Sequence, residues 1–128
     1  MVIGTSILVV EDDHDVLESI RELLEDSGYQ VTAARNGVEA LAVLAQMAPP
    51  AAMLVDSLMA EMSGAEFLKA CAADPKLAGI PAIVISTDAT PNRIERLMAL
   101  GARGYVTKPF RPESLRAELE RTLGAPCD

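Results

Sequence analysis

Cysteine is scarce in this chain, which has two cysteines among 128 residues. Cys71 lies within a helical pattern and Cys127 is the next-to-last residue. Two cysteines placed so far apart form neither a disulfide framework nor the close spacing of a metal site. We therefore expect two reduced thiols, as is usual for a cytosolic protein.

Positive charge and long apolar runs are also lacking. The net charge is −8 and the isoelectric point is near 4.6, and no basic cluster is present to neutralise nucleic-acid phosphates. No stretch is apolar over the length of a membrane span, and the N-terminus lacks the basic region and apolar core of a secretion signal. The sequence predicts a soluble, cytoplasmic protein that binds neither nucleic acid nor membranes.

Hydrophobic residues make up 50% of the chain, which suits one domain with its own core and, at this length, not two. Short apolar runs alternate five times with segments of helical periodicity. The runs are too short for helices, and the strongest are rich in Val and Ile. They predict strands at residues 7–10, 29–33, 51–55, 82–85 and 104–106.

Between and after these runs, apolar residues recur at spacings of three and four, the period of an amphipathic helix. The first helical segment ends near Gly28, which suits a helix C-cap, and the second ends before Pro49. The stripes are Val16, Leu17, Ile20, Leu23 and Leu24; Val38, Leu41 and Leu44; Phe67, Leu68 and Cys71; Ile94, Leu97 and Met98; and Leu115 and Leu119 with Thr122 or Leu123.

This alternation of strand and helix predicts an α/β fold, in which parallel βαβ units with right-handed crossovers form a three-layer sandwich. Ligands of such sheets bind beyond the carboxyl ends of the strands. The polar residues that follow the predicted strands there are Glu11, Asp12, Asp56, Ser86, Thr87, Thr107 and Lys108.

The run "EDDHD" at residues 11–15 is unusually acidic. Neighbouring carboxylates disfavour one another's charge unless a cation, hydrogen bonds or water relieves them. A helix start would explain Asp13 and Asp15, because Asp is a good N-cap and acids are favourable in a first helical turn. A helix start explains Glu11 and Asp12 less well. Together with Asp56, these two acids offer carboxylate oxygens suited to a Mg²⁺ ion, which usually keeps several of its water ligands.

The remaining strand-end residues suit an anion beside such a cation. The negative oxygens of a phosphoryl group would be neutralised by Mg²⁺, Lys108 and Ser86. A carboxylate at a strand end can attack a phosphoryl group to form an acyl phosphate, which makes Asp56 the candidate nucleophile. Ser86 and Thr87 are adjacent, so alternation allows only one of them to face the site.

Four motifs, "ILVVEDD", "LVDSLMAEMSG", "IPAIVIST" and "GYVTKPF", occur in the order and approximate spacing of the receiver domains of two-component response regulators. The chain resembles this CheY-like family over nearly its whole length. The resemblance implies a flavodoxin-like (βα)5 fold whose parallel sheet has the order 2-1-3-4-5. It also implies a single receiver domain over residues 1–128, with a core of about residues 5–123 and no output domain in this chain.

The resemblance implies a role for each site residue. Asp56 would be the phosphoacceptor. Asp12 would bind Mg²⁺ directly and Glu11 through water, with Asp56 and the backbone carbonyl of Leu58 as further ligands. No other cofactor is expected.

The resemblance also implies a switch. Ser86, chosen over Thr87 by its motif, and Lys108 would contact the phosphoryl group, and the bond from Lys108 to Pro109 would be cis. The ring of Tyr105 would move inward as Ser86 is drawn to the phosphate. The change would then reach the face formed by residues 91–100, 104–106 and 112–123.

The expected function is a phosphorylation-dependent signalling switch in a two-component system or phosphorelay. A sensor histidine kinase or a histidine phosphotransfer protein would donate the phosphoryl group, and a downstream protein would read the changed face. The chain would not be an enzyme in the ordinary sense, although it would catalyse its own phosphorylation and dephosphorylation. It would be either a stand-alone regulator or a receiver cut from a longer protein.

Some residues depart from the family pattern. Ala60 stands where Pro is usual, Ser63 where Asp is common and Thr87 where a smaller residue is usual, while Leu58 and Asp88 occupy positions that tune access to the phosphate. Ala60 and Thr87 suggest one alternative, a receiver-shaped interaction module that never carries phosphate, although the complete acid, hydroxyl and lysine set argues against it.

A second alternative is an aspartate-based phosphatase of the haloacid dehalogenase type. The sequence "DHDV" suggests it, because such enzymes use two acids one residue apart after the first strand. Its nucleophile would be Asp13, which lies late for that role, three residues past Val10, and no cap insertion is present.

Overall fold

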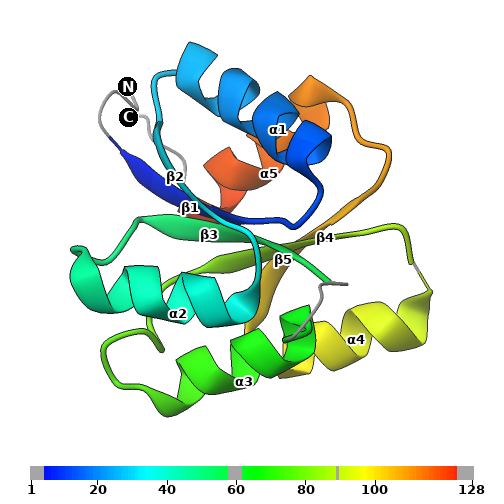
Figure 1. Cartoon of the computed structure of the whole chain (residues 1–128). Coiled ribbons are helices and arrows are strands. Elements are labelled where there is room, and N and C mark those ends of the chain that lie inside the picture. The colour runs from blue at the N-terminus through cyan, green and yellow to red at the C-terminus, as the bar shows by residue number, and fades with distance from the viewer. Residues whose placement is uncertain (1–4, 58–61, 89, 124–128) are drawn as a thin grey trace.

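The computed structural model describes residues 5–57, 62–88 and 90–123 of the chain. In these residues five strands alternate with five helices (Figure 1). The strands are β1 (Ser6–Val10), β2 (Gln30–Ala34), β3 (Ala52–Asp56), β4 (Ala82–Ser86) and β5 (Ala102–Thr107). The helices are α1 (His14–Asp26), α2 (Gly37–Gln46), α3 (Gly64–Ala73), α4 (Pro91–Ala99) and α5 (Pro112–Leu123).

The strands form one parallel sheet in the order β2-β1-β3-β4-β5. This order confirms the predicted α/β, flavodoxin-like architecture. Strand β5 is longer than predicted, since it begins at Ala102 and not at residue 104. Its residues alternate between buried and exposed positions, so its first half forms no continuous apolar run.

Alternation along the strands divides the core between two faces of the sheet. The α1/α5 face, covered by α1 and α5, buries Ile7, Val9, Leu54, Ile83 and Ile85. The α2–α4 face, covered by α2, α3 and α4, buries Leu8, Val10, Met53, Val55 and Val84. Figure 1 shows these two helical layers on opposite sides of the sheet.

Two apolar residues that the helical stripes include do not face the core. Val38 is 52% exposed and Met98 is 41% exposed. In α2, Ala40 and Leu44 occupy the buried positions. Val38 lies six residues before Leu44, so at 3.6 residues per turn it points well away from the buried side of the helix. In α4, Leu97 is buried and its neighbour Met98 lies about 100° around the helix.

Helix α3 begins with a reciprocal cap. The Ser63 side chain accepts a hydrogen bond from the Glu66 backbone N–H, and the Glu66 side chain accepts one from the Ser63 N–H. Ser63, noted above as a departure from the family pattern, is therefore a good N-cap residue here. Ala60 lies outside the described residues. Within the described part of the chain, no helix is both long and apolar enough to span a membrane.

Gly64 allows α3 to start directly against the end of β3. Its N–H donates to the Ser57 carbonyl over 3.2 Å. A Cβ at this position would lie 2.7 Å from the Asp56 carbonyl oxygen and 2.9 Å from the Ser57 Cα. These contacts are with backbone, which cannot turn aside as a flexible side chain could, so only glycine fits without a shift of α3 or β3.

We predict that Gly64→Ala lowers the free energy of unfolding by about 1–3 kcal/mol, the usual cost of overpacking. Urea unfolding followed by circular dichroism measures this change. The matched control is Gly79→Ala, because a Cβ at Gly79 meets no atom within 4 Å. Equal stabilities of the two variants would show that the close contact at Gly64 is not a constraint.

Candidate functional site at the carboxyl edge of the sheet

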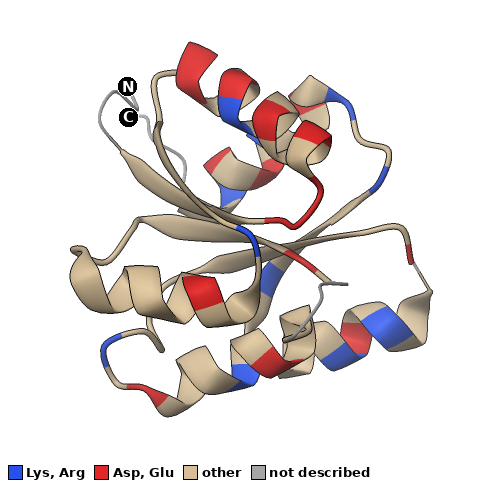
Figure 2. Ribbon diagram, viewed as in Figure 1, with Lys and Arg blue, Asp and Glu red and all other residues tan. Residues whose placement is uncertain are grey.

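Three acidic side chains meet at the carboxyl ends of β1 and β3. Among the described residues, ligand oxygens from Glu11, Asp12 and Asp56 all lie within 4.8 Å of one another. Figure 2 shows acidic segments at the adjoining ends of these strands. Glu11 and Asp56 are buried, with 1% and 6% exposure, whereas Asp12 is exposed. The structure thus brings together the three acids predicted at this edge, and of these Asp12 is open to solvent.

Lys108 extends from the end of β5 to this acidic cluster. Its Nζ lies 3.1 Å from Glu11 Oε1 and 3.5 Å from Asp56 Oδ2. Its backbone N–H donates to the Ser86 carbonyl over 2.7 Å, which extends the pairing of β4 and β5 past the last residue of β5. The peptide bond from Lys108 to Pro109 is cis. One ammonium group therefore interacts with carboxylates from two different strands.

The pKa values of these groups reflect burial and mutual charge. Burial, and then a side-chain hydrogen bond with Asp56, raises the pKa of Glu11 to about 7. Burial acts to lower the pKa of Lys108, but its hydrogen bond with Glu11 and the negative charges of Glu11 and Asp56 outweigh burial and raise it. The site thus stabilises the charged form of Lys108 and disfavours the charged form of Glu11.

Asp13 has a different role from the three clustered acids. Its Oδ1 accepts hydrogen bonds from the N–H groups of Asp15 and Val16, at 2.9 and 3.2 Å, and so caps α1. Its own N–H donates to Glu11 Oε2 over 3.1 Å. The helix-start explanation is therefore confirmed for Asp13, and a capping carboxylate outside the acidic cluster is poorly placed to be a nucleophile.

The Ser86 hydroxyl is buried and bonded on two sides. Ser86 is the last residue of β4 and is 1% exposed, whereas Thr87 is exposed. Ser86 Oγ lies 2.7 Å from Ser57 Oγ and accepts a hydrogen bond from the Asp88 N–H over 3.0 Å. The sequence reasoning missed Ser57, although a hydroxyl residue directly after the Asp of β3 is a visible signal. The sequence does not show that the Ser57 hydroxyl bonds to Ser86 on β4.

The hydroxyl pair and the buried acids Glu11 and Asp56 belong to opposite faces of the sheet. Asp56 follows Leu54 by two residues, which places it on the α1/α5 face. Ser57 follows Val55 by two and Ser86 follows Val84 by two, which places both on the α2–α4 face. Asp56 and Ile85 are register partners, so Ser57 and Ser86, each one residue further, are level with each other. A hydroxyl that is to reach Asp56 must therefore turn around the end of β4.

Asp88 connects Ser86 to Tyr105. The Asp88 N–H donates to Ser86 Oγ, and the Asp88 carbonyl accepts a hydrogen bond from the half-buried Tyr105 hydroxyl. The Asp88 carboxylate accepts hydrogen bonds from the backbone N–H and the side chain of Thr90, which lower its pKa. The segment after β4 is thus held at Asp88 by residues of two strands.

The whole pattern of strand-end acids, hydroxyl and lysine corresponds to a known family. The family whose profile matches residues 7–120 is the response regulator receiver domain. The chain belongs to this family.

Receiver domains from several bacteria are similar to it. Chemotaxis protein CheY1 of Helicobacter pylori is 34% identical over 119 residues, which cover 92% of this chain and 96% of that protein. The structure of chemotaxis protein CheY4 of Vibrio cholerae matches with a TM-score of 0.87 and 34% identity, covering 93% of this chain and 98% of that one. The receiver domain of a sensor histidine kinase from Pseudomonas aeruginosa matches with a TM-score of 0.86 and 26% identity, covering 95% and 99%.

The Pseudomonas aeruginosa receiver domain holds a magnesium ion in its active-site cleft. In the present receiver domain the donor set also fits this ion, because all three acids offer hard carboxylate oxygens and one of them is solvent-exposed. Glu11 Oε1 is buried, and the Lys108 ammonium lies 3.1 Å from it. Leu58, predicted to add a backbone carbonyl, lies outside the described residues.

We predict that Lys108→Met lowers the free energy of unfolding by about 1–3 kcal/mol, because it leaves buried carboxylates without their charged partner. The measurement is urea unfolding at pH 8 without divalent cations, where Glu11 is mostly ionised. The control is Lys69→Met, since Lys69 is exposed on α3 and its loss should change stability by less than about 0.5 kcal/mol. An unchanged stability of Lys108→Met would mean that these ion pairs are not stabilising.

Proposed function

We propose that this receiver domain is a phosphorylation-dependent switch of a two-component system or phosphorelay, with Asp56 as its phosphoacceptor. The observation that carries the proposal is the setting of Asp56: a carboxylate at a strand end, clustered with Glu11 and Asp12, with Lys108 Nζ 3.5 Å away. Receiver domains interact with histidine kinases. The proposed donor is accordingly a phosphohistidine of a sensor histidine kinase or of a histidine phosphotransfer protein.

The proposed reaction transfers a phosphoryl group from nitrogen to oxygen. An Asp56 carboxylate oxygen forms the new P–O bond while the P–N bond to the histidine breaks, and the imidazole nitrogen keeps the electron pair. Lys108 neutralises charge on the phosphoryl oxygens, and Ser86 donates a hydrogen bond to one of them. The receiver domain thereby catalyses its own phosphorylation and, with water as the attacking group, its own dephosphorylation.

Bound Mg²⁺ would supply positive charge for both the acidic side chains and the incoming phosphoryl oxygens. Asp12 and Asp56 are the proposed direct ligands with the Leu58 carbonyl, and Glu11 is proposed to act through a bound water. The exposed position of Asp12 and the buried position of Glu11 support this division of roles. An ion at this site would also relieve the repulsion between the acids.

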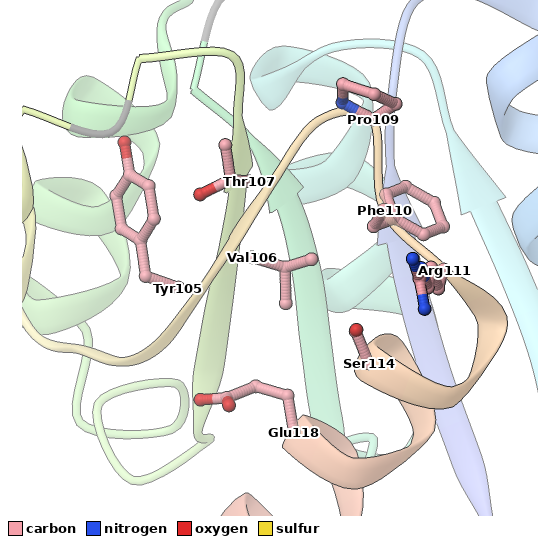
Figure 3. A pocket seen from close by; sticks show the side chains of 8 residues that line it. All are labelled: Tyr105, Val106, Thr107, Pro109, Phe110, Arg111, Ser114 and Glu118. Atoms are coloured by element: carbon pink, nitrogen blue, oxygen red, sulfur yellow. The ribbon is translucent and has the colours of Figure 1, made fainter.

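The proposed signal begins at Ser86 and ends at the surface. If Ser86 turns toward a phosphoryl group on Asp56, it releases the Asp88 N–H, and Asp88 is also bonded to the Tyr105 hydroxyl. Tyr105 lines a pocket of about 350 Å³ between β5 and α5, together with Arg111, Ser114 and Glu118 (Figure 3). We therefore propose that a downstream protein binds the face formed by α4, β5 and α5.

The magnesium proposal predicts that Mg²⁺ stabilises the receiver domain by about 1.4 kcal/mol when its free concentration is ten times the dissociation constant. Asp12→Asn should raise the concentration needed for this effect by about tenfold or more, because it removes a charged ligand. Thermal unfolding against Mg²⁺ concentration measures the shift. Asp13→Asn is the matched control, since it removes the neighbouring charge while Asn still caps α1. Equal responses of the two variants would contradict the ligand set.

The phosphorylation proposal predicts that incubation with Mg²⁺ and phosphoramidate adds a single, base-labile phosphoryl group, detected by intact mass. Asp56→Asn should abolish the adduct, and chelation of Mg²⁺ should prevent it, whereas Asp13→Asn should retain it. Loss of the adduct in Asp13→Asn alone would favour the phosphatase alternative. No adduct on the wild-type chain, with no binding of beryllium fluoride, would favour the phosphate-independent interaction module.

A further inference from the structure

Ser57 is a buried polar residue that the proposed reaction does not use. It directly follows Asp56 and is 1% exposed. Its backbone is tied on both sides, since its N–H donates to the Ile85 carbonyl over 3.0 Å and its carbonyl accepts from the Gly64 N–H over 3.2 Å. Its hydroxyl lies 2.7 Å from that of Ser86. The Ser57 side chain is therefore held in a fixed position against the Ser86 hydroxyl.

The Ser57 hydroxyl donates to Ser86 Oγ, which also accepts the Asp88 N–H. A serine hydroxyl has two acceptor lone pairs, so both acceptor positions of Ser86 are occupied in this arrangement. The two serines are level on β3 and β4 and share the α2–α4 face, whereas Asp56 lies on the α1/α5 face. The bond from Ser57 thus holds the Ser86 side chain on the face opposite to Asp56.

We infer that Ser57 restrains the phosphorylation switch by holding Ser86 away from Asp56. The inference rests on the proposed function, in which Ser86 donates to a phosphoryl group on Asp56. To do so Ser86 must turn toward the α1/α5 face, and the bond to Ser57 is lost. The Ser57–Ser86 hydrogen bond would exist only in the unphosphorylated state, so its free energy favours that state. Phosphorylation of Asp56 must supply at least this free energy to turn Ser86.

The experiment measures how tightly beryllium fluoride, a phosphoryl mimic, binds with Mg²⁺ to the wild-type chain and to Ser57→Ala. One ordinary hydrogen bond corresponds to a factor of roughly two to ten in an equilibrium constant. Ser57→Ala should therefore bind beryllium fluoride roughly two- to tenfold more tightly and gain phosphate from phosphoramidate faster. Damage to the packing would act in the opposite direction, so tighter binding separates a restraint from a structural role.

Two further variants test whether Ser57 acts through Ser86. Ser57→Thr keeps the hydroxyl and should restore wild-type affinity. In a Ser86→Ala background, Ser57→Ala should add no further change, because the group it restrains is gone. Thermal unfolding of each variant establishes that it is folded, and if Ser57→Thr does not fold, the double-variant comparison decides.

The outcomes distinguish this inference from the proposed function. Unchanged or weaker beryllium fluoride binding by Ser57→Ala, or an equal gain with Ser86→Ala present, would overturn the restraint and leave the phosphoacceptor role of Asp56 intact. A wild-type chain that neither binds beryllium fluoride nor forms a phosphoryl adduct would overturn both.

Discussion

The site depends on the interaction of one ammonium group with two buried carboxylates. Parallel strands end at a common edge, so Glu11 after β1 and Asp56 at the end of β3 are forced close together. Burial makes the charge of Glu11 costly, as its raised pKa shows. Lys108, carried to them by β5, provides the compensating charge. Two buried acids and the exposed Asp12 thus meet at one edge, with Lys108 beside the buried pair.

Strand alternation separates Glu11 and Asp56 from the Ser86 hydroxyl with which Asp56 is proposed to act. Glu11 and Asp56 follow the residues of the α1/α5 face, whereas Ser57 and Ser86 follow those of the α2–α4 face. In the proposed switch, this separation gives Ser86 a resting position away from Asp56. It also places Ser86 next to Asp88 and, through Asp88, next to Tyr105.

Much of the fold was predictable because local patterns and the global fold agree. The apolar runs of β1, β3 and β4 are buried on both faces and therefore stand out in the sequence. The start of β5 was missed because an edge strand alternates between buried and exposed residues. Val38 and Met98 were placed in apolar stripes because spacing alone does not show that smaller or neighbouring residues occupy the core positions.

By itself, the sequence determined the order of strands and helices, the edge at which functional groups gather, and the identity of the acids and the lysine there. These follow from periodicity and from motifs, which are properties of neighbouring residues. Only the tertiary structure decided that Lys108 contacts both Glu11 and Asp56 and that the Ser57 hydroxyl bonds to that of Ser86. Such contacts depend on the register and burial of strands far apart in the chain, which no local pattern encodes.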